Sequence, residues 1–186
     1  MTYIQTISVD QASGVLKNLY AELMGKRGKL AAVHEAQSLN SDVLRQHMAL
    51  YMATMFGQSP LSRAEREMIA VVVSAANQCG YCTEHHAQAL NHYWKNQERI
   101  AELKSGRFAV HLNAREYALC IFAQVLTQNA AAISDNEHMI PLRESGLNDR
   151  EILDAVGIIS YFNYVNRIVL GLGVHLEGDG GGGFKY

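Results

Sequence analysis

The stretch that decides the fold reads EMIAVVVSAANQCGYCTEHH, residues 67–86. Apolar residues recur at helical spacing over residues 67 to about 77, and Gly80 follows in or near a break. A further helix is expected from about residue 79 or 81 to Trp94. The stretch therefore predicts two consecutive helices, the second of which begins with a Cys-x-x-Cys pair.

Capping signals mark the starts of three helices around this stretch. Ser62 can cap the helix behind it while Glu65 reaches back to the start of the same helix. The pattern recurs at residues 113–116 and at residues 148–151, each time before apolar residues at helical spacing. The last of these helices is expected to end around residue 171 or 173, where glycines stand.

Two more helices are expected in the N-terminal third of the chain. One begins near Asp10 and ends at the glycines of positions 25 and 28, and the other begins at residue 40 or 41 and ends at Gly57. Few stretches alternate apolar and polar residues, so no substantial sheet is expected. We therefore predict a single all-α domain, a helical bundle over residues 1–176, and a flexible glycine-rich tail over 177–186.

Composition excludes several classes of protein. The chain has 186 residues, of which 48% are hydrophobic and 18% are charged, and its formal net charge is −2. It is long enough to bury a sizeable core and too apolar to be disordered or collagen-like. It has no basic field that would attract nucleic acid. Three cysteines are too few and too unevenly placed for a disulfide scaffold.

The sequence shows no export signal at its N-terminus, which lacks a basic start and a long apolar run. The most apolar stretch, residues 155–174, contains Asn163, Asn166 and Arg167, so it predicts a buried or amphipathic helix rather than a membrane span. We therefore expect a cytoplasmic protein. Thiols stay reduced there, and a close cysteine pair is more often catalytic or metal-binding than structural.

An internal echo links two parts of the chain. The pattern of residues 62–77 recurs 86 positions later, and Asn77 matches Asn163. The echo is either the trace of a duplicated helix pair or a chance similarity between capped helices. Apolar residues replace the cysteines and the histidine in the second copy, so any chemistry is expected in the first copy only.

The candidate chemical site consists of Cys79, Cys82, His86 and Glu67. At helical spacing the two cysteines and His86 share an arc of roughly 60°, whereas His85 points about 100° away from His86. A thiolate is the reactive form of cysteine, and a helix N-terminus favours that anion. An imidazole one turn on can take the thiol proton, and a carboxylate can orient the imidazole. A second cysteine can condense with a sulfenic acid to give a disulfide.

These residues resemble a known family. The pattern E-x11-CGYC-x3-H of residues 67–86 is similar to the core motif of AhpD-like alkylhydroperoxidases in the carboxymuconolactone decarboxylase superfamily. LSRAERE at 61–67 and FNYVNR at 162–167 are similar to its peroxidase-related branch. The resemblance covers about residues 41–176, with its core motif in 61–95. It implies an AhpD-like all-helical fold, a homo-oligomer built on trimers or hexamers, and peroxide reduction by the cysteine pair.

The resemblance also implies roles for the four residues. Cys82 would be the peroxidatic cysteine and Cys79 the resolving one, while His86 and Glu67 would relay protons. Tyr81 is a departure, because the best-known members have histidine directly before the second cysteine. A tyrosine can donate a hydrogen bond but cannot act as a base near neutral pH. The family's proton route at this position therefore does not carry over.

Other interpretations stay open at the level of sequence. The cysteines could be two half-buried thiols without a role, or they could bind zinc together with Glu67 and His86. A redox-sensing helical oligomer and an enzyme acting on a lactone or carboxylic acid are further alternatives. Cys120 is expected in the core, and His47 could face the pocket.

We predict a thiol-dependent peroxidase, an oxidoreductase that reduces alkyl hydroperoxides through the Cys79–Cys82 pair. The expected reaction converts a hydroperoxide and two thiols into an alcohol, water and a disulfide. The expected partners are the peroxide, an unidentified thiol reductant and further copies of the chain. No metal, organic cofactor, nucleic acid or membrane is expected.

Overall fold

The computed structural model describes residues 2–108, 111–178 and 180. Within this part of the chain every regular element is a helix and no strand occurs, so the all-α prediction is confirmed. The elements in chain order are α1 (Gly14–Arg27), α2 (Ala32–Glu35), α3 (Ser41–Phe56), α4 (Arg63–Ala76), α5 (Gly80–Trp94), α6 (Gln97–Lys104), α7 (Ala114–Gln128), the 3-10 helix η1 (Ala130–Ala132), the π-helix η2 (Asp135–Met139), α8 (Ile140–Glu144) and α9 (Asp149–Leu172).

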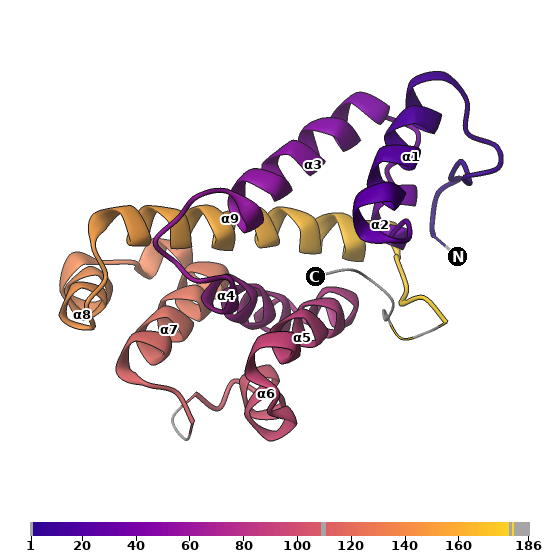
Figure 1. Ribbon diagram of the computed structural model, residues 1–186. Helices are drawn as coiled ribbons and strands as arrows, with labels where there is room; N and C mark the ends of the chain where they lie inside the picture. The colour runs from indigo at the N-terminus through magenta and orange to yellow at the C-terminus, as the bar shows by residue number, and fades with distance from the viewer. Residues whose placement is uncertain (1, 109–110, 179, 181–186) are drawn as a thin grey trace.

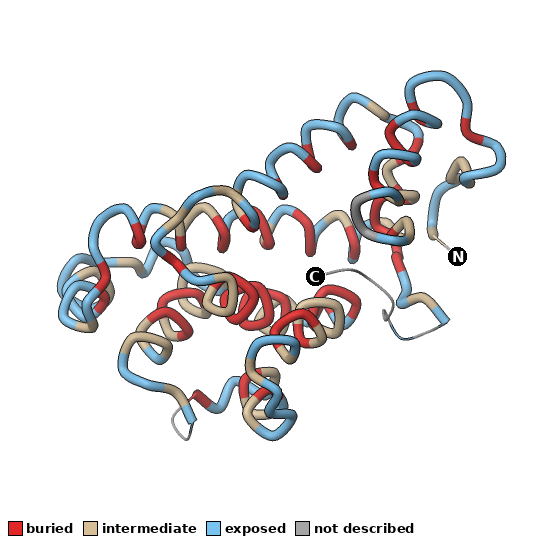
Figure 2. The backbone as a smooth tube through the Cα atoms, viewed as in Figure 1, coloured by how far each residue is buried: buried red, intermediate tan, exposed pale blue. Residues whose placement is uncertain are grey.

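The longest helix, α9, runs through the middle of the molecule (Figure 1). It packs against α3, α4 and α7, and α4 packs in turn against α5 and α6. Figure 2 shows buried residues concentrated along α4 and on the inner side of α9. Nine consecutive residues of α4, from Arg66 to Ser74, are buried. The core of the fold therefore surrounds α4, the helix that directly precedes the cysteine pair.

The capping signals explain where the main helices begin. Ser62, Asn113 and Asn148 each accept a hydrogen bond from the backbone N–H three residues on, and the glutamate at that position accepts one from the backbone N–H of the cap. These three capping boxes start α4, α7 and α9. The helix α9 ends at Gly173, whose φ of 64° suits glycine.

The break between α4 and α5 is short and has an unusual backbone. Gln78 adopts a φ of 56°, a left-handed conformation that a non-glycine residue rarely adopts. Gly80 lies directly after the break as the first residue of α5, and a Cβ on it would meet no atom within 4 Å. The turn therefore depends on Gln78, and its effect is to start a new helix at the cysteine pair.

Two regions qualify the sequence-based description. By length and composition α9 is the one described helix that could cross a membrane, and 44% of its apolar window is buried inside this fold. The predicted tail begins at Glu177, but that side chain binds α2 and α5. Residues 179 and 181–186 of the tail lie outside the described residues.

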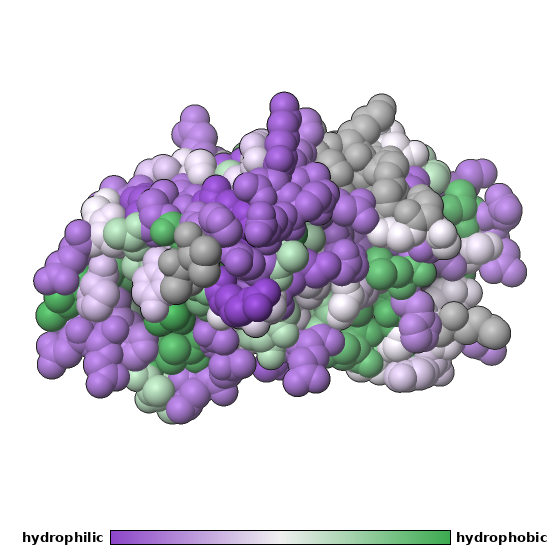
Figure 3. All heavy atoms as spheres, turned by 90° about the horizontal axis from the view of Figure 1, so that it is seen from below, coloured by the Kyte–Doolittle hydropathy of each residue, from purple (hydrophilic) through white to green (hydrophobic). Residues whose placement is uncertain are grey.

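The surface on the side of the molecule where α6 lies is mainly hydrophilic (Figure 3). Hydrophobic residues appear there in separate patches rather than as one continuous area. Larger exposed apolar side chains occur on α3 and α9, where Leu50, Phe56, Leu153 and Leu170 are between 45% and 65% exposed.

Candidate active site

The start of α5 brings the two sulfur atoms together. Cys79 is the N-cap residue of α5 and Cys82 lies in its first turn. The Cys79 and Cys82 sulfur atoms lie 3.0 Å apart, within reach of a hydrogen bond between them, and both cysteines are free thiols. Both are buried: Cys79 is completely buried and Cys82 is 3% exposed. A disulfide bond of about 2.05 Å could form here with a small movement of the side chains.

The two thiols titrate as a pair. A hydrogen bond from Cys82 lowers the pKa of Cys79, although burial opposes this, and the Cys82 backbone N–H lowers it further. The same sulfur–sulfur interaction, together with burial, raises the pKa of Cys82. A hydrogen bond from the Asn166 side chain opposes these two effects and lowers the pKa of Cys82. The first proton therefore leaves the pair at a lower pH than it would leave an ordinary thiol, and the second is retained because two adjacent thiolates would repel each other.

A buried carboxylate orients His86. His86 Nδ1 lies 2.6 Å from Glu67 Oε2, and Glu67 Oε1 accepts hydrogen bonds from the Arg63 guanidinium at 2.9 and 2.5 Å. The Glu67 side chain is only 1% exposed. Burial alone would raise its pKa, but the charges and hydrogen bonds of His86 and Arg63 lower it below the usual value. Glu67 therefore stays ionised and orients the His86 imidazole.

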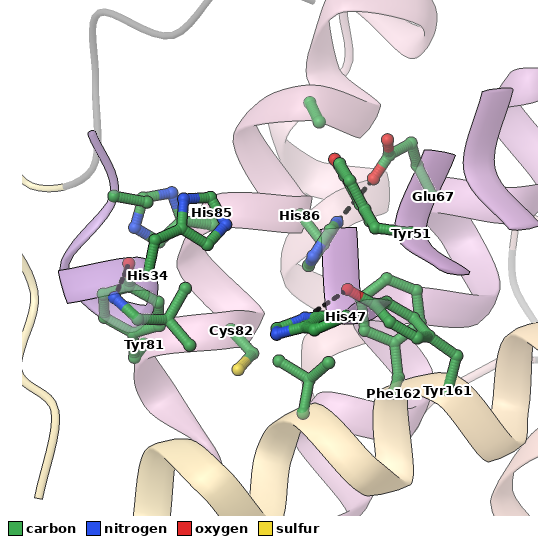
Figure 4. Close-up of a pocket in the computed structure, with 14 residues that line it drawn as sticks. His34, His47, Tyr51, Glu67, Tyr81, Cys82, His85, His86, Tyr161 and Phe162 are labelled. Carbon is green, nitrogen blue, oxygen red and sulfur yellow. Dashed lines mark hydrogen bonds and ion pairs between the residues drawn. The ribbon is translucent and has the colours of Figure 1, made fainter. Parts of the chain in front are cut away.

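A cavity of about 60 Å³ connects these groups (Figure 4). One water molecule needs roughly 10–15 Å³ of such space, so the cavity has room for a few waters or one small ligand. Cys82 lines it, whereas Cys79 lies behind Cys82 and does not. The other polar lining residues are Glu67, His34, His47, His85, His86, Tyr51, Tyr81 and Tyr161.

One wall of the cavity carries a neutral histidine. Burial lowers the pKa of His47 to about 4, so its imidazole is uncharged near neutral pH. Gln37 donates to the Val33 carbonyl, and this orients its amide oxygen toward His47 Nδ1 at 3.0 Å. Since Nδ1 therefore carries the proton, Nε2 accepts the hydrogen bond from the Tyr161 hydroxyl at 2.8 Å.

The opposite wall contains a second carboxylate–histidine pair. His85 Nε2 lies 2.9 Å from Glu177 Oε2, and Glu177 Oε1 accepts hydrogen bonds from the Tyr81 hydroxyl at 3.0 Å and from the Ala32 backbone N–H at 2.9 Å. Partial burial alone would raise the pKa of Glu177, but these donors lower it to about 2. Glu177 is therefore ionised and connects α2 and α5 to the segment after α9.

The geometry does not favour the zinc alternative. In the described part of the chain no three His, Cys, Asp or Glu side chains are arranged to bind one metal ion. Glu67 Oε1 accepts hydrogen bonds from Arg63 and Oε2 is paired with His86 Nδ1, so both oxygens of Glu67 already have partners.

The structure brings the four predicted site residues together, with Glu67 near the start of α4 and Cys79, Cys82 and His86 in and before the first two turns of α5. It adds Arg63 to them, and the four-residue spacing from Arg63 to Glu67 was a local signal for that pair. His85 was judged the worse partner on angular grounds, and it indeed binds a different carboxylate, Glu177. No local signal could have revealed that pair, because its two residues are 92 positions apart.

A comparison with protein families points to one group. The model of the carboxymuconolactone decarboxylase family matches residues 41–124. This match supports a place for the chain in the carboxymuconolactone decarboxylase superfamily. The matched region runs from the start of α3 into α7 and contains every residue of the Cys79–Cys82, His86 and Glu67 set.

Known structures share the fold over nearly the whole chain. An uncharacterized peroxidase-related protein from Silicibacter sp. TM1040 is 29% identical with a TM-score of 0.84, and the match covers all of both chains. The alkylhydroperoxidase AhpD core of a peroxidase-related protein from Ralstonia eutropha JMP134 is 24% identical with a TM-score of 0.87, over 97% of this chain and 94% of that one. The chain therefore has the AhpD-like fold.

A curated relative is much longer. Sestrin-3 of Mus musculus is 26% identical over 175 residues, which is 88% of this chain and 32% of sestrin-3. The chain thus spans about a third of the length of that relative.

Proposed function

We propose that the protein is a thiol-dependent peroxidase that reduces small hydroperoxides. The observation that carries the proposal is the position of Cys82. Its sulfur lines a small cavity beside the Glu67–His86 pair and lies 3.0 Å from a second thiol. A nucleophile, a base, an orienting carboxylate and a resolving thiol thus occur together. The peroxidase-related description of the Silicibacter protein agrees with this chemistry.

In the first step, Cys82 attacks the hydroxyl oxygen of the peroxide. His86 takes the thiol proton, a new S–O bond forms, and the O–O bond breaks with its electron pair on the departing alkoxide. The pKa of Cys79 is lowered and that of Cys82 is raised, so Cys79 loses its proton before Cys82 does. Only Cys82 reaches the cavity, however, and a proton can pass between sulfurs that are 3.0 Å apart.

In the second step, Cys79 attacks the sulfenic acid on Cys82. A disulfide forms, and the hydroxide that leaves takes a proton to become water. The lowered pKa of Cys79 in the reduced pair agrees with a role as the attacking thiol, because the thiolate is the form that attacks. Two electrons from an external thiol then reduce the disulfide and close the cycle.

The cavity favours small, uncharged peroxides. Its volume of about 60 Å³ suits hydrogen peroxide or a short alkyl hydroperoxide. No lysine or arginine is among the described residues that line it, and its one carboxylate, Glu67, is already paired. A charged substrate would thus enter without a partner for its charge.

The test is thiol-dependent consumption of hydrogen peroxide and ethyl hydroperoxide by the purified protein, with zinc measured on the same sample. We expect turnover with a dithiol reductant and less than stoichiometric zinc. A protein that consumes neither peroxide, or that carries one tightly bound zinc per chain and loses it with each of the four site variants, would overturn the proposal.

We also propose a cytoplasmic homo-oligomer, a trimer or hexamer as the family resemblance implies. The exposed apolar side chains of α3 and α9 support association, since Leu50, Leu153 and Leu170 would be shielded from water in an interface. Light scattering at micromolar concentration is the measurement. A mass near the chain's 20.6 kDa would refute the oligomer.

A further inference from the structure

The proposed peroxidase chemistry uses one carboxylate–histidine pair and leaves a second one unassigned. His85 lines the same cavity as Cys82 and His86. Figure 4 shows His85 and His86 on opposite sides of Cys82. His86 belongs to the side of Glu67, whereas His85 belongs to the side of Tyr81 and Glu177.

The second pair is built as firmly as the first. Glu177 contacts three groups from two segments: Tyr81 and His85, one turn apart on α5, and the Ala32 backbone N–H at the start of α2. The His85 side chain is 12% exposed and that of Glu177 is 19% exposed. Tyr81 stacks near His85 with ring centroids 4.4 Å apart. These contacts fix the orientation of the His85 imidazole at the cavity wall.

Peroxide cleavage needs two proton transfers at different places. The thiol must lose its proton before it attacks, and the oxygen that leaves must gain one, because an alkoxide is a strong base and a poor leaving group. One histidine at the sulfur cannot readily do both at once on opposite ends of the O–O bond. A second histidine across the cavity meets this need.

We propose that His85 is the general acid that protonates the leaving oxygen and that Glu177 is its positioning residue. This inference rests on the proposed peroxidase function. In the step, the Cys82 thiolate forms the S–O bond, the O–O bond breaks, and the alkoxide takes a proton from His85 to leave as an alcohol. The Glu177 carboxylate, 2.9 Å from His85 Nε2, orients the imidazole for the transfer. His85 regains its proton from solvent after the alcohol leaves.

Leaving-group dependence tests this role directly. Ethyl hydroperoxide and peracetic acid both have two carbons, but the first releases ethoxide and the second releases acetate, which leaves without a proton. The readout is the rate constant for oxidation of Cys82 in the full-length chain, followed by quenched flow with dimedone trapping. His85→Gln keeps an amide that can bind Glu177 but cannot donate a proton as an acid.

We expect His85→Gln to slow the reaction with ethyl hydroperoxide by roughly 10²–10⁴-fold and to change the rate with peracetic acid little. His86→Gln should slow both oxidants, because the thiol proton must leave in either case. Glu177→Gln should show the same selectivity as His85→Gln with a smaller loss. His92→Gln, an exposed histidine on the same helix, is the matched control and should change neither rate.

The outcomes separate the two proposals. If the unmodified protein oxidises Cys82 with neither compound, the peroxidase function itself fails. If it reacts with both but His85→Gln loses both rates equally, or neither, the acid role is wrong while the peroxidase function stands. Should Glu177→Gln lower both rates equally, its role is structural and the positioning part of the proposal is wrong. His85→Ala rescued by added imidazole only with ethyl hydroperoxide would support the acid role independently of folding.

Discussion

The two halves of the internal echo, α4 with α5 and the first part of α9, begin alike and end differently. Each starts with a capping box, and Arg115 binds the glutamates of both boxes, Glu65 at 2.6 Å and Glu151 at 2.7 Å. Further along, Asn77 donates to its counterpart Asn163 at 3.1 Å. The two segments therefore run side by side in the same direction, and their matching residues share Arg115 at one end and contact each other at the other.

The difference lies after these asparagines. In the first segment the backbone turns at Gln78, and a new helix begins at Cys79. The second segment continues without a break to Asn166, which is completely buried and binds Asn77 and Ser74. The comparison teaches that the chemistry depends on the break. The break creates a helix N-terminus, where backbone N–H groups are free to interact with the cysteine sulfur atoms. In an unbroken helix these N–H groups bind the carbonyls of the preceding turn.

Removing the sulfurs takes away what distinguishes the first segment, and we expect the largest effect there. Cys82→Ser should abolish peroxide reduction, since a hydroxyl is far less acidic than a thiol. Cys79→Ser should permit the first attack and stop turnover, so that a sulfenic acid on Cys82 is trapped by dimedone and seen by mass spectrometry. Cys120→Ala is the control, because Cys120 is buried and its burial raises its pKa. Trapped sulfenic acid on Cys79 in Cys82→Ser would reverse the two roles.

The second largest effect is expected for Glu67, the carboxylate that binds His86. Glu67→Gln keeps the shape of the side chain but removes the charge that stabilises protonated His86, so the rate of Cys82 oxidation should fall by roughly 10²–10⁴-fold. Glu84→Gln is a matched control on α5, because Glu84 binds Lys104 outside the cavity. Equal rates for Glu67→Gln and the unmodified protein would show that the pair is only structural.

Loss of the hydrogen bonds between α4 and α9 should lower the stability of the protein. Asn166→Ala removes the partner of the buried Ser74 hydroxyl and one of the two acceptors of the Asn77 amide, so we expect a loss of about 1–3 kcal/mol in the free energy of unfolding. It also removes the hydrogen bond that lowers the pKa of Cys82, so thiol oxidation should slow. Asn163→Ala, at a partly exposed position, should cost less because water can replace its contacts. Chemical denaturation measures both.

The contact between the last described segment and α5 should depend on pH. The pKa of Glu177 lies at about 2 in the folded protein against an ordinary value of 4.5. Its contribution to stability is therefore complete above pH 4.5 and is lost as the pH falls toward 2. The difference in unfolding free energy between the unmodified protein and Glu177→Gln should shrink over that window. A constant difference from pH 6 to pH 2 would contradict the ion pair with His85.

Sequence alone predicted most of the fold because its signals are local. A capping box spans four residues, and Ser62 with Glu65 marks the start of α4 without any knowledge of tertiary structure. The same locality explains why the spacing of Cys79, Cys82 and His86 predicted one face of a helix. The structure puts these side chains around one cavity or directly behind it.

The rest of the site depends on contacts between distant segments. Tyr161 meets His47 across 114 positions, and Glu177 meets His85 across 92. A helical wheel describes the angle of His85 around α5, but it contains no information on which other segment approaches that side. The boundary drawn at residue 177 was set by the glycines that follow it, while Glu177 itself is fixed by its carboxylate.

The smallest expected effect concerns the break itself. Gln78 and Lys95 have φ angles of 56° and 50°, so each is a non-glycine residue in a left-handed conformation, one before α5 and one at its end. A left-handed conformation costs roughly 1–2 kcal/mol without glycine, and glycine loses roughly 0.5–1 kcal/mol in entropy. Gln78→Gly and Lys95→Gly should therefore each stabilise the protein by about 0.5–1 kcal/mol in chemical denaturation. Only Gln78→Gly loosens the turn that positions Cys79, so it alone should slow sulfenic acid resolution, by a small factor. Equal resolution rates in the two variants would mean that the turn starts the helix but does not tune the sulfur pair.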